Sequence, residues 1–275
     1  MPWISLIFGA IVGLSLGLTG GGGAIFAVPM LVYGLSVAPR EAVGISLAAV
    51  GATSFVGFLQ RWKSSQVEIR TGLLFAVAGM VGAPIGSWLA GLIPEPVLLA
   101  MFAVLMLVVA FRMWSKAVSD ANVVAAACPV ANPDEDGPSC RRDAQGALLL
   151  TSKCARLLLL VGLLTGVLSG LFGVGGGFVI VPALVLFSGM AMHRAVGTSL
   201  LVVTLVSISA VGSHLYAGRT IPIELTLLFI TGGAGGMLVG NLLSRRISGP
   251  VLQKGFAVAV VAVAAFVLYR TTVLK

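Results

Sequence analysis

The chain has 275 residues, of which 58% are hydrophobic and only 9% are charged, and its net charge is +8. A soluble domain carries about 25% charged residues, so this composition excludes a water-soluble globular protein and predicts an integral membrane protein. The positive charge does not indicate nucleic-acid binding, because the lysines and arginines lie in short loops between apolar runs, where they act as topology signals. We therefore expect the lipid bilayer as a partner and no nucleic acid.

Apolar segments, taken in chain order, predict an all-α polytopic membrane protein. Six stretches approach the roughly 20 residues that a helix needs to cross a bilayer. These stretches are residues 45–59, 71–93, 96–111, 199–213, 225–243 and 255–268. Four shorter stretches form two pairs, 3–18 with 24–37 and 156–172 with 177–190, and glycines separate the members of each pair. We divide the chain into a first membrane repeat (1–115), a linker loop (116–153) and a second membrane repeat (154–275).

A glycine-rich motif occurs twice, 153 positions apart. The first copy, GLTGGGGAIFAVPMLV, begins at Gly17, and the second, GLFGVGGGFVIVPALV, begins at Gly170. Between residues 17 and 47, 15 of 31 positions are identical at this offset, and the register continues into AVGIS from Ala42 and AVGTS from Ala195. The sequence therefore predicts two homologous halves, each with a glycine-broken helix pair and three further transmembrane helices.

The repeated break predicts a substrate site. Glycine costs about 1 kcal/mol against alanine in a helix, and a break at membrane depth is tolerated only where it lines a cavity or is buried in protein. Where helices resume after the glycines, their first N–H groups and the helix dipole favour a small anion. We predict that the substrate-binding residues are Gly20, Gly22, Gly23, Ala24, Ser46, Gly173, Gly175, Gly176, Gly177, Thr198 and Ser199.

Close helix packing is the alternative explanation of a glycine, because small residues let membrane helices approach one another. Packing is the reading that we favour for the glycines spaced at three and four in both halves, and it remains open for the doubled motif. These spaced glycines are Gly79, Gly82, Gly86, Gly233, Gly236 and Gly240.

Charged side chains are absent from the middle of every apolar segment. A carboxylate proton relay and a carboxylate cage for a hard cation therefore lack candidates, and we expect no catalytic residues, no metal and no cofactor. Four basic residues at segment ends could attract anions or gate the path: Arg40, Arg61, Arg194 and His214. The three cysteines belong to the linker and its exit, and we expect no disulfide among them if the linker faces a reducing cytoplasm.

Basic residues predict the orientation. Loops with Arg61 and Arg70, and the linker with Arg141 and Arg142, are separated by two crossings, so all of these residues are expected in the cytoplasm. If each glycine-motif pair makes one broken crossing, the two halves are parallel; if each pair is a hairpin, they are inverted. The charge counts nearly tie, and we favour inverted repeats because midplane sites between inverted repeats are a common transporter plan.

The doubled motif resembles the sulfite exporter TauE/SafE family of membrane permeases. The second half carries GVGGGFVIVP and AVGTS, the first half carries the looser GGGGAIFAVP and AVGIS, and His214 to Gly218 fits the family's H-x-x-x-G pattern. Ile45 stands where the family motif has threonine. The resemblance implies a permease of the cell inner membrane that moves small sulfur-containing anions, such as sulfite, sulfonates or sulfoacetate, without a cofactor.

Sequence alone leaves alternatives to this secondary transporter. A passive small-anion channel and a carrier of another organic anion, such as a carboxylate, both fit the same pattern. A membrane-embedded enzyme does not, because no nucleophile, acid or metal set faces the predicted cavity. The chain could also form a homo-oligomer.

Overall fold

The computed structural model describes residues 2–21, 23–62, 64, 67–94, 97–98, 100–102, 104–105, 107–108, 111, 152–172, 177–188, 190, 192–218, 222–244, 255, 258, 261–262 and 265. Helices and short turns make up this part of the chain, and no strand occurs in it. The linker and most of the predicted segment 255–268 lie outside the described residues, and segment 96–111 is described only in part, its described residues from 97 onward being helical.

The elements follow one another in the same order in both halves. The first half contains α1 (Pro2–Thr19), α2 (Ala24–Pro29), the π-helix η1 (Met30–Gly34), α3 (Pro39–Trp62) and α4 (Ile69–Leu92). The second half contains α6 (Ser152–Phe172), α7 (Gly177–Phe187), α8 (Met192–Tyr216) and α9 (Ile223–Ser244). Within the described residues, α3, α4, α6, α8 and α9 are long and apolar enough to cross a membrane, which confirms an all-helical, multi-pass membrane protein.

Both central helices begin earlier than the apolar pattern predicts. The sequence places the starts of these two apolar segments at residues 45 and 199, whereas α3 begins at Pro39 and α8 at Met192. Hydropathy misses the first turns because they carry arginine, histidine and small residues. Proline suits the start of α3, because the first turn of a helix does not need its N–H group.

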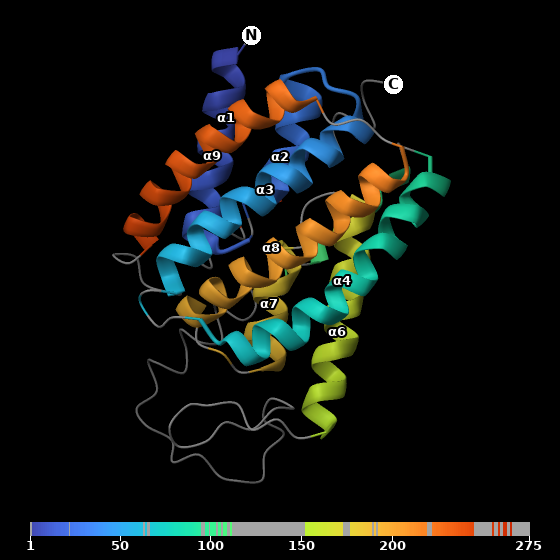
Figure 1. Cartoon of the computed structure of the whole chain (residues 1–275), viewed down its shortest axis with the longest axis vertical. Coiled ribbons are helices and arrows are strands. Elements are labelled where there is room, and N and C mark those ends of the chain that lie inside the picture. Colours follow the sequence, from blue (N-terminus) through green and yellow to red (C-terminus); the bar gives the residue numbers. More distant parts are fainter. Residues whose placement is uncertain are drawn as a thin grey trace.

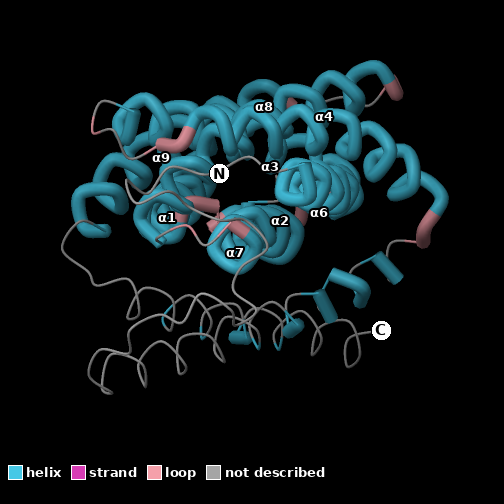
Figure 2. Tube along the Cα trace, turned by 90° about the horizontal axis from the view of Figure 1, so that it is seen from below, coloured by secondary structure: helices cyan, strands magenta, loops and turns pink. Residues whose placement is uncertain are grey.

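Four helices lie side by side in one layer, in the order α9, α3, α8, α4 (Figures 1 and 2). The second layer contains α1 next to α9, α6 next to α4, and the short α2 and α7 between them (Figure 2). The most extensive helix contacts are α1 with α9 and α4 with α6. The first helix of each half therefore packs against the last described long helix of the other half.

Glycines make these two outer contacts close. A methyl group added at Gly13 or Gly236 would collide with a carbonyl of the partner helix, that of Gly233 or Ala10 respectively. Gly9 lies against Phe229 and Gly17 against Met237, so the residue numbers rise together and α1 runs parallel to α9.

The contact of α4 with α6 has the same construction. A methyl group added at Gly166 would collide with the Gly79 carbonyl, and one added at Gly82 would collide with the Leu163 carbonyl. Gly86 lies against Val167. These two helices are therefore also parallel. The packing role expected for the spaced glycines is confirmed at all six positions, each of which lies against a neighbouring helix: Gly79, Gly82, Gly86, Gly233, Gly236 and Gly240.

The two central helices, in contrast, run antiparallel. Gly44 lies against His214, Gly51 against Ser207, and Gly57 against Leu200, and Figure 1 shows α3 and α8 as adjacent diagonal ribbons of opposite course. Helices α3 and α8 are equivalent in the duplication, and their contacts are centred near Ala52 and Leu205.

Cys154 lies at the start of α6, is fully buried and is disulfide-bonded. The sequence analysis expected no disulfide only for a linker that faces a reducing cytoplasm. Disulfides persist mainly in oxidising compartments, so this bond bears on which side of the membrane the linker faces.

Candidate functional site

The chain reverses direction at the first glycine run. Helix α1 ends at Thr19, and Gly20 has a φ of +75°, a conformation that side chains rarely adopt. Gly23 then packs against Ser15 and Leu16, and further along Gly34 lies against the ring of Phe8. Residue numbers fall on α1 as they rise on α2 and η1, so α1 and α2 form an antiparallel hairpin.

The two glycine motifs of the duplicated halves meet at Gly21 and Gly177. A methyl group added at Gly21 would lie 2.6 Å from the Gly177 carbonyl oxygen, and one added at Gly177 would lie 2.6 Å from the Gly21 Cα. Gly177 is the first residue of α7, whose opening N–H groups have no partner within the helix. The backbone of one motif therefore touches the start of the helix that follows the other.

A hydroxyl of the second half binds the first glycine run. The hydroxyl of Ser199 lies within hydrogen-bond distance of the Gly20 carbonyl and, at 2.8 Å, of the Val196 carbonyl in its own helix, and its single proton is shared between these two acceptors. The side chain of Val196 also packs directly against Gly20. The AVGTS stretch thus holds the opposite half's turn in place.

Ser46, the duplicate of Ser199, differs from it in hydrogen bonding. Its side chain is fully buried, and its hydroxyl has no hydrogen-bond partner among the described residues. Ser54 on the same helix and its duplicate Ser207 on α8 share this property. A buried polar group without a partner costs about 1–3 kcal/mol, so these three hydroxyls are available to a ligand or to water.

Thr198 accepts a hydrogen bond of 3.0 Å from the backbone N–H of Glu68, the residue that precedes α4. The carboxylate of Glu68 also lies 3.8 Å from the guanidinium of Arg194 and accepts a bond from Thr71. Arg194 is half exposed, so this ion pair contributes little stability. Two of the predicted site residues therefore fasten the start of α8 to the start of α4.

Arg61 is buried, with 1% of its surface exposed, although it lies in the last turn of α3. Its Nη2 atom donates to the Gly17 carbonyl at 3.1 Å and to the Ser244 hydroxyl at 2.7 Å. A cation suits the C-terminal carbonyls of a helix, so Arg61 joins the ends of α1, α3 and α9. Its anion-attracting role stays a prediction.

His214 occupies the position equivalent to Arg61, 153 residues later. It is also 1% exposed, and its imidazole packs against Gly44 of the AVGIS stretch, where an added methyl group would lie 2.6 Å from Nε2. The duplication therefore places a buried basic side chain near the end of each central helix.

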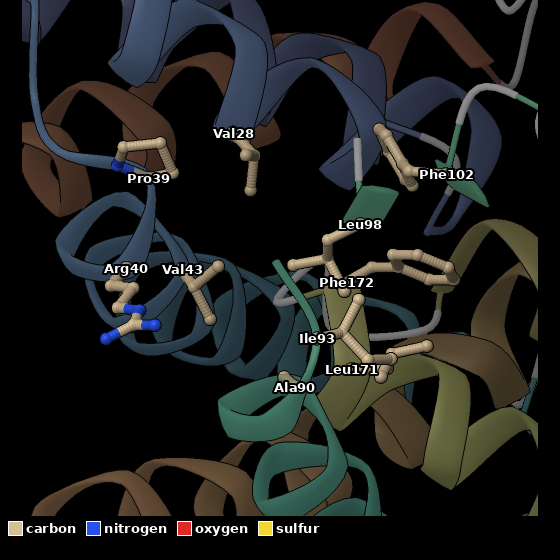
Figure 3. A pocket seen from close by; sticks show the side chains of 10 residues that line it. All are labelled: Val28, Pro39, Arg40, Val43, Ala90, Ile93, Leu98, Phe102, Leu171 and Phe172. Carbon is tan, nitrogen blue, oxygen red and sulfur yellow. The ribbon is translucent and has the colours of Figure 1, made fainter. Parts of the chain in front are cut away.

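Arg40 is exposed at the start of α3, on the wall of a cavity of about 40 Å³ (Figure 3). Ala24, at the start of α2, is fully buried. Four of the predicted site glycines lie outside the described residues: Gly22, Gly173, Gly175 and Gly176.

Sequence reasoning missed three features of this region. Gly21 was not selected, although it belongs to the same run of four glycines. Glu68 was not selected either, and the cavity beside Arg40 could not be foreseen, because its walls come from distant segments. A carboxylate just before a helix was the one available signal for Glu68.

The class of protein is a polytopic membrane transport protein. Three features define it: apolar helices of membrane length, two glycine motifs that meet, and central helices that are duplicates of each other. The family model for "Sulfite exporter TauE/SafE" matches residues 5–267, and the chain belongs to this family. A probable membrane transporter protein of Xylella fastidiosa (strain 9a5c) is 35% identical over 269 residues, which cover 96% of this chain and 93% of the relative.

A second relative is more distant. YunE, a probable membrane transporter protein of Bacillus subtilis (strain 168), is 25% identical over 275 residues, which cover 97% of this chain and 97% of the relative. No solved structure matches the chain. The family and these relatives make the protein a multi-pass membrane transporter.

Proposed function

We propose that the protein is a secondary transporter of small sulfur-containing anions such as sulfite, sulfonates or sulfoacetate. The observation that carries the proposal is the contact of Gly21 with Gly177, where the two motifs meet beside the start of α7. Glycines have no side chain that could cover the backbone N–H groups there, and we expect such groups to bind small anions without a cationic side chain. Membership of a family described as sulfite exporters supports sulfite as one substrate.

The course of the helices supports inverted repeats. Helices α3 and α8 are duplicates and run antiparallel, and α1 with α2 forms a hairpin. Of the two topologies left open by the charge pattern, a hairpin in each half requires the inverted one. An anion site between inverted repeats would lie near the bilayer midplane, as in other transporters of this plan.

A ligand panel tests the substrate class. Purified protein in detergent is melted with sulfite, alkylsulfonates, sulfate or carboxylates, and we expect stabilisation by sulfite and sulfonates, since a ligand that binds the native state raises its melting temperature. Stabilisation by a carboxylate and by no sulfur oxyanion would overturn the substrate class.

Substitution of the second glycine run tests the site. We expect Gly175→Val or Gly176→Val to abolish sulfite counterflow in proteoliposomes while folded protein remains in the membrane. Gly235→Val is the matched control, because nothing lies within 4 Å of a side chain at that position. Unimpaired counterflow in both motif variants would refute the site. Flux without counterflow would instead indicate a passive channel.

We further propose the cell inner membrane as the location, with the linker in the cytoplasm, as the distribution of basic residues favours. The disulfide of Cys154 argues for the opposite side. Labelling of Cys128 and Cys140 in intact cells with an impermeant maleimide, with and without prior reduction, decides between the two. Labelling of reduced intact cells would refute the cytoplasmic placement.

A further inference from the structure

The cavity beside Arg40 connects the surface with the second glycine motif. Its exposed end is formed by Pro39 and Arg40 at the start of α3, and its buried end by Leu171 and Phe172 (Figure 3). Phe172 is the last residue of α6 and directly precedes Gly173. The cavity therefore leads from a cationic mouth towards the predicted anion site.

The walls of this cavity are apolar apart from Arg40. They are formed by Val28, Pro39, Val43, Ala90, Ile93, Leu98, Phe102, Leu171 and Phe172. At the buried end the rings of Phe102 and Phe172 lie 5.3 Å apart at an angle of 44°. An oxyanion would lose its hydration on such walls and gain no hydrogen bond, whereas a hydrocarbon group is favoured there.

The size of the cavity limits what it can accept. Its volume is about 40 Å³, whereas an engineered apolar cavity of about 150 Å³ binds benzene. By proportion, this cavity has room for about two carbon atoms. We therefore expect an ethyl group to fit, and a butyl chain or an aromatic ring to be too large.

We propose that this cavity binds the hydrocarbon part of the transported anion and restricts it to about two carbons, with Arg40 attracting the anion at the mouth and Phe102 limiting chain length. This inference rests on the proposed function, since it names the organic part of the same substrate. It makes a short alkylsulfonate a better ligand than inorganic sulfite or a long-chain sulfonate.

The test is ligand-dependent melting of the full chain with sulfite and with methane-, ethane-, butane- and benzenesulfonate. We expect affinity to rise about fourfold from methane- to ethanesulfonate, the effect of burying one methylene group, and to fall for the two larger probes. Phe102→Ala should reverse this order, so that butane- or benzenesulfonate binds at least as tightly as ethanesulfonate.

Two further variants separate specificity from a general loss of structure. Phe58→Ala is the matched control, because Phe58 also belongs to a ring pair, with Trp62 at 5.3 Å, but lies outside this cavity. It should leave the order of the probes unchanged. Ala90→Val fills the cavity and should remove the preference for ethanesulfonate while sulfite binding stays within about twofold.

The outcomes distinguish this inference from the proposed function. If sulfite and sulfonates bind but chain length has no effect, or if Phe58→Ala changes the order as much as Phe102→Ala, the cavity is not a substrate pocket and the inference alone fails. If no sulfur oxyanion binds the wild-type protein, the proposed function fails and the inference with it.

Discussion

Glycines act in two different ways in this molecule. In the outer helix pairs, Gly13 and Gly166 lie inside regular helices and let a partner backbone, at Gly233 and Gly79 respectively, come into direct contact. In the first motif, by contrast, the run of four from Gly20 to Gly23 separates α1 from α2, and Gly20 has a positive φ. The two uses differ in sequence: glycines three or four apart pack helices, whereas the run of four glycines ends a helix and reverses the chain.

The helix-packing glycines and the motif glycines should therefore respond differently to substitution. The outer pairs join α1 to α9 and α6 to α4, so they hold the two halves together. The motif glycines instead bring one half's turn against the other half's Gly177 and Val196. Substitutions in the first set should therefore affect stability, and those near the second should affect transport as well.

The largest expected effect is loss of folding in Gly166→Val. The valine side chain would enter the space of the Gly79 backbone, which has no side chain that could move aside. Overpacking costs about 1–3 kcal/mol where side chains can yield, so we expect a loss of roughly 3 kcal/mol or more and little monodisperse protein. Size-exclusion chromatography and melting of the detergent-solubilised protein measure it, and Gly13→Val should behave alike. A melting temperature near that of the wild type would contradict the packing role.

An intermediate effect is expected for Ser199→Ala. Removal of the hydroxyl leaves the buried Gly20 carbonyl without this donor, so we expect a loss of about 1–2 kcal/mol. The matched variant is Ser46→Ala, the duplicate position, whose hydroxyl has no partner among the described residues.

For Ser46→Ala we expect unchanged or slightly higher stability, but weaker sulfite binding, because this hydroxyl is available to the anion. Melting curves with and without sulfite separate the two effects. Equal destabilisation by both variants would show that the duplicated serines contribute equally to stability. Normal sulfite binding by Ser46→Ala would exclude that residue from the site.

The smallest expected effect is a gain of stability in Gly235→Ala or Gly212→Ala. Both positions lie within helices, and nothing is within 4 Å of an added side chain. Alanine is favoured over glycine in a helix by up to about 1 kcal/mol. A rise in melting temperature of a few degrees would agree, whereas a fall would show that these glycines contact something outside the described residues.

Much of the architecture could be predicted from the sequence. Composition and apolar segments indicated a multi-pass helical protein, the doubled motif indicated a duplication, and regular spacing indicated that Gly82 and Gly236 pack helices. These features depend on local pattern and on repetition. Both are visible in a single sequence.

The pairing of distant segments could not be predicted in this way. Arg61 was expected at a loop end, but Gly17 and Ser244 surround it, and they lie 44 and 183 positions away in the chain. The hydrogen bond from Ser199 to Gly20 spans 179 positions. Such contacts depend on how helices are arranged in three dimensions. The sequence carried no signal for them beyond the matching of the two copies.

Each half packs its outer helix against the other half, α1 against α9 and α6 against α4. Without α9, the glycine face of α1 would have no backbone to pack against, and α6 would be equally bare without α4. A single repeat unit is thus an incomplete fold. A half expressed alone is therefore expected to need a second copy to cover these glycine faces.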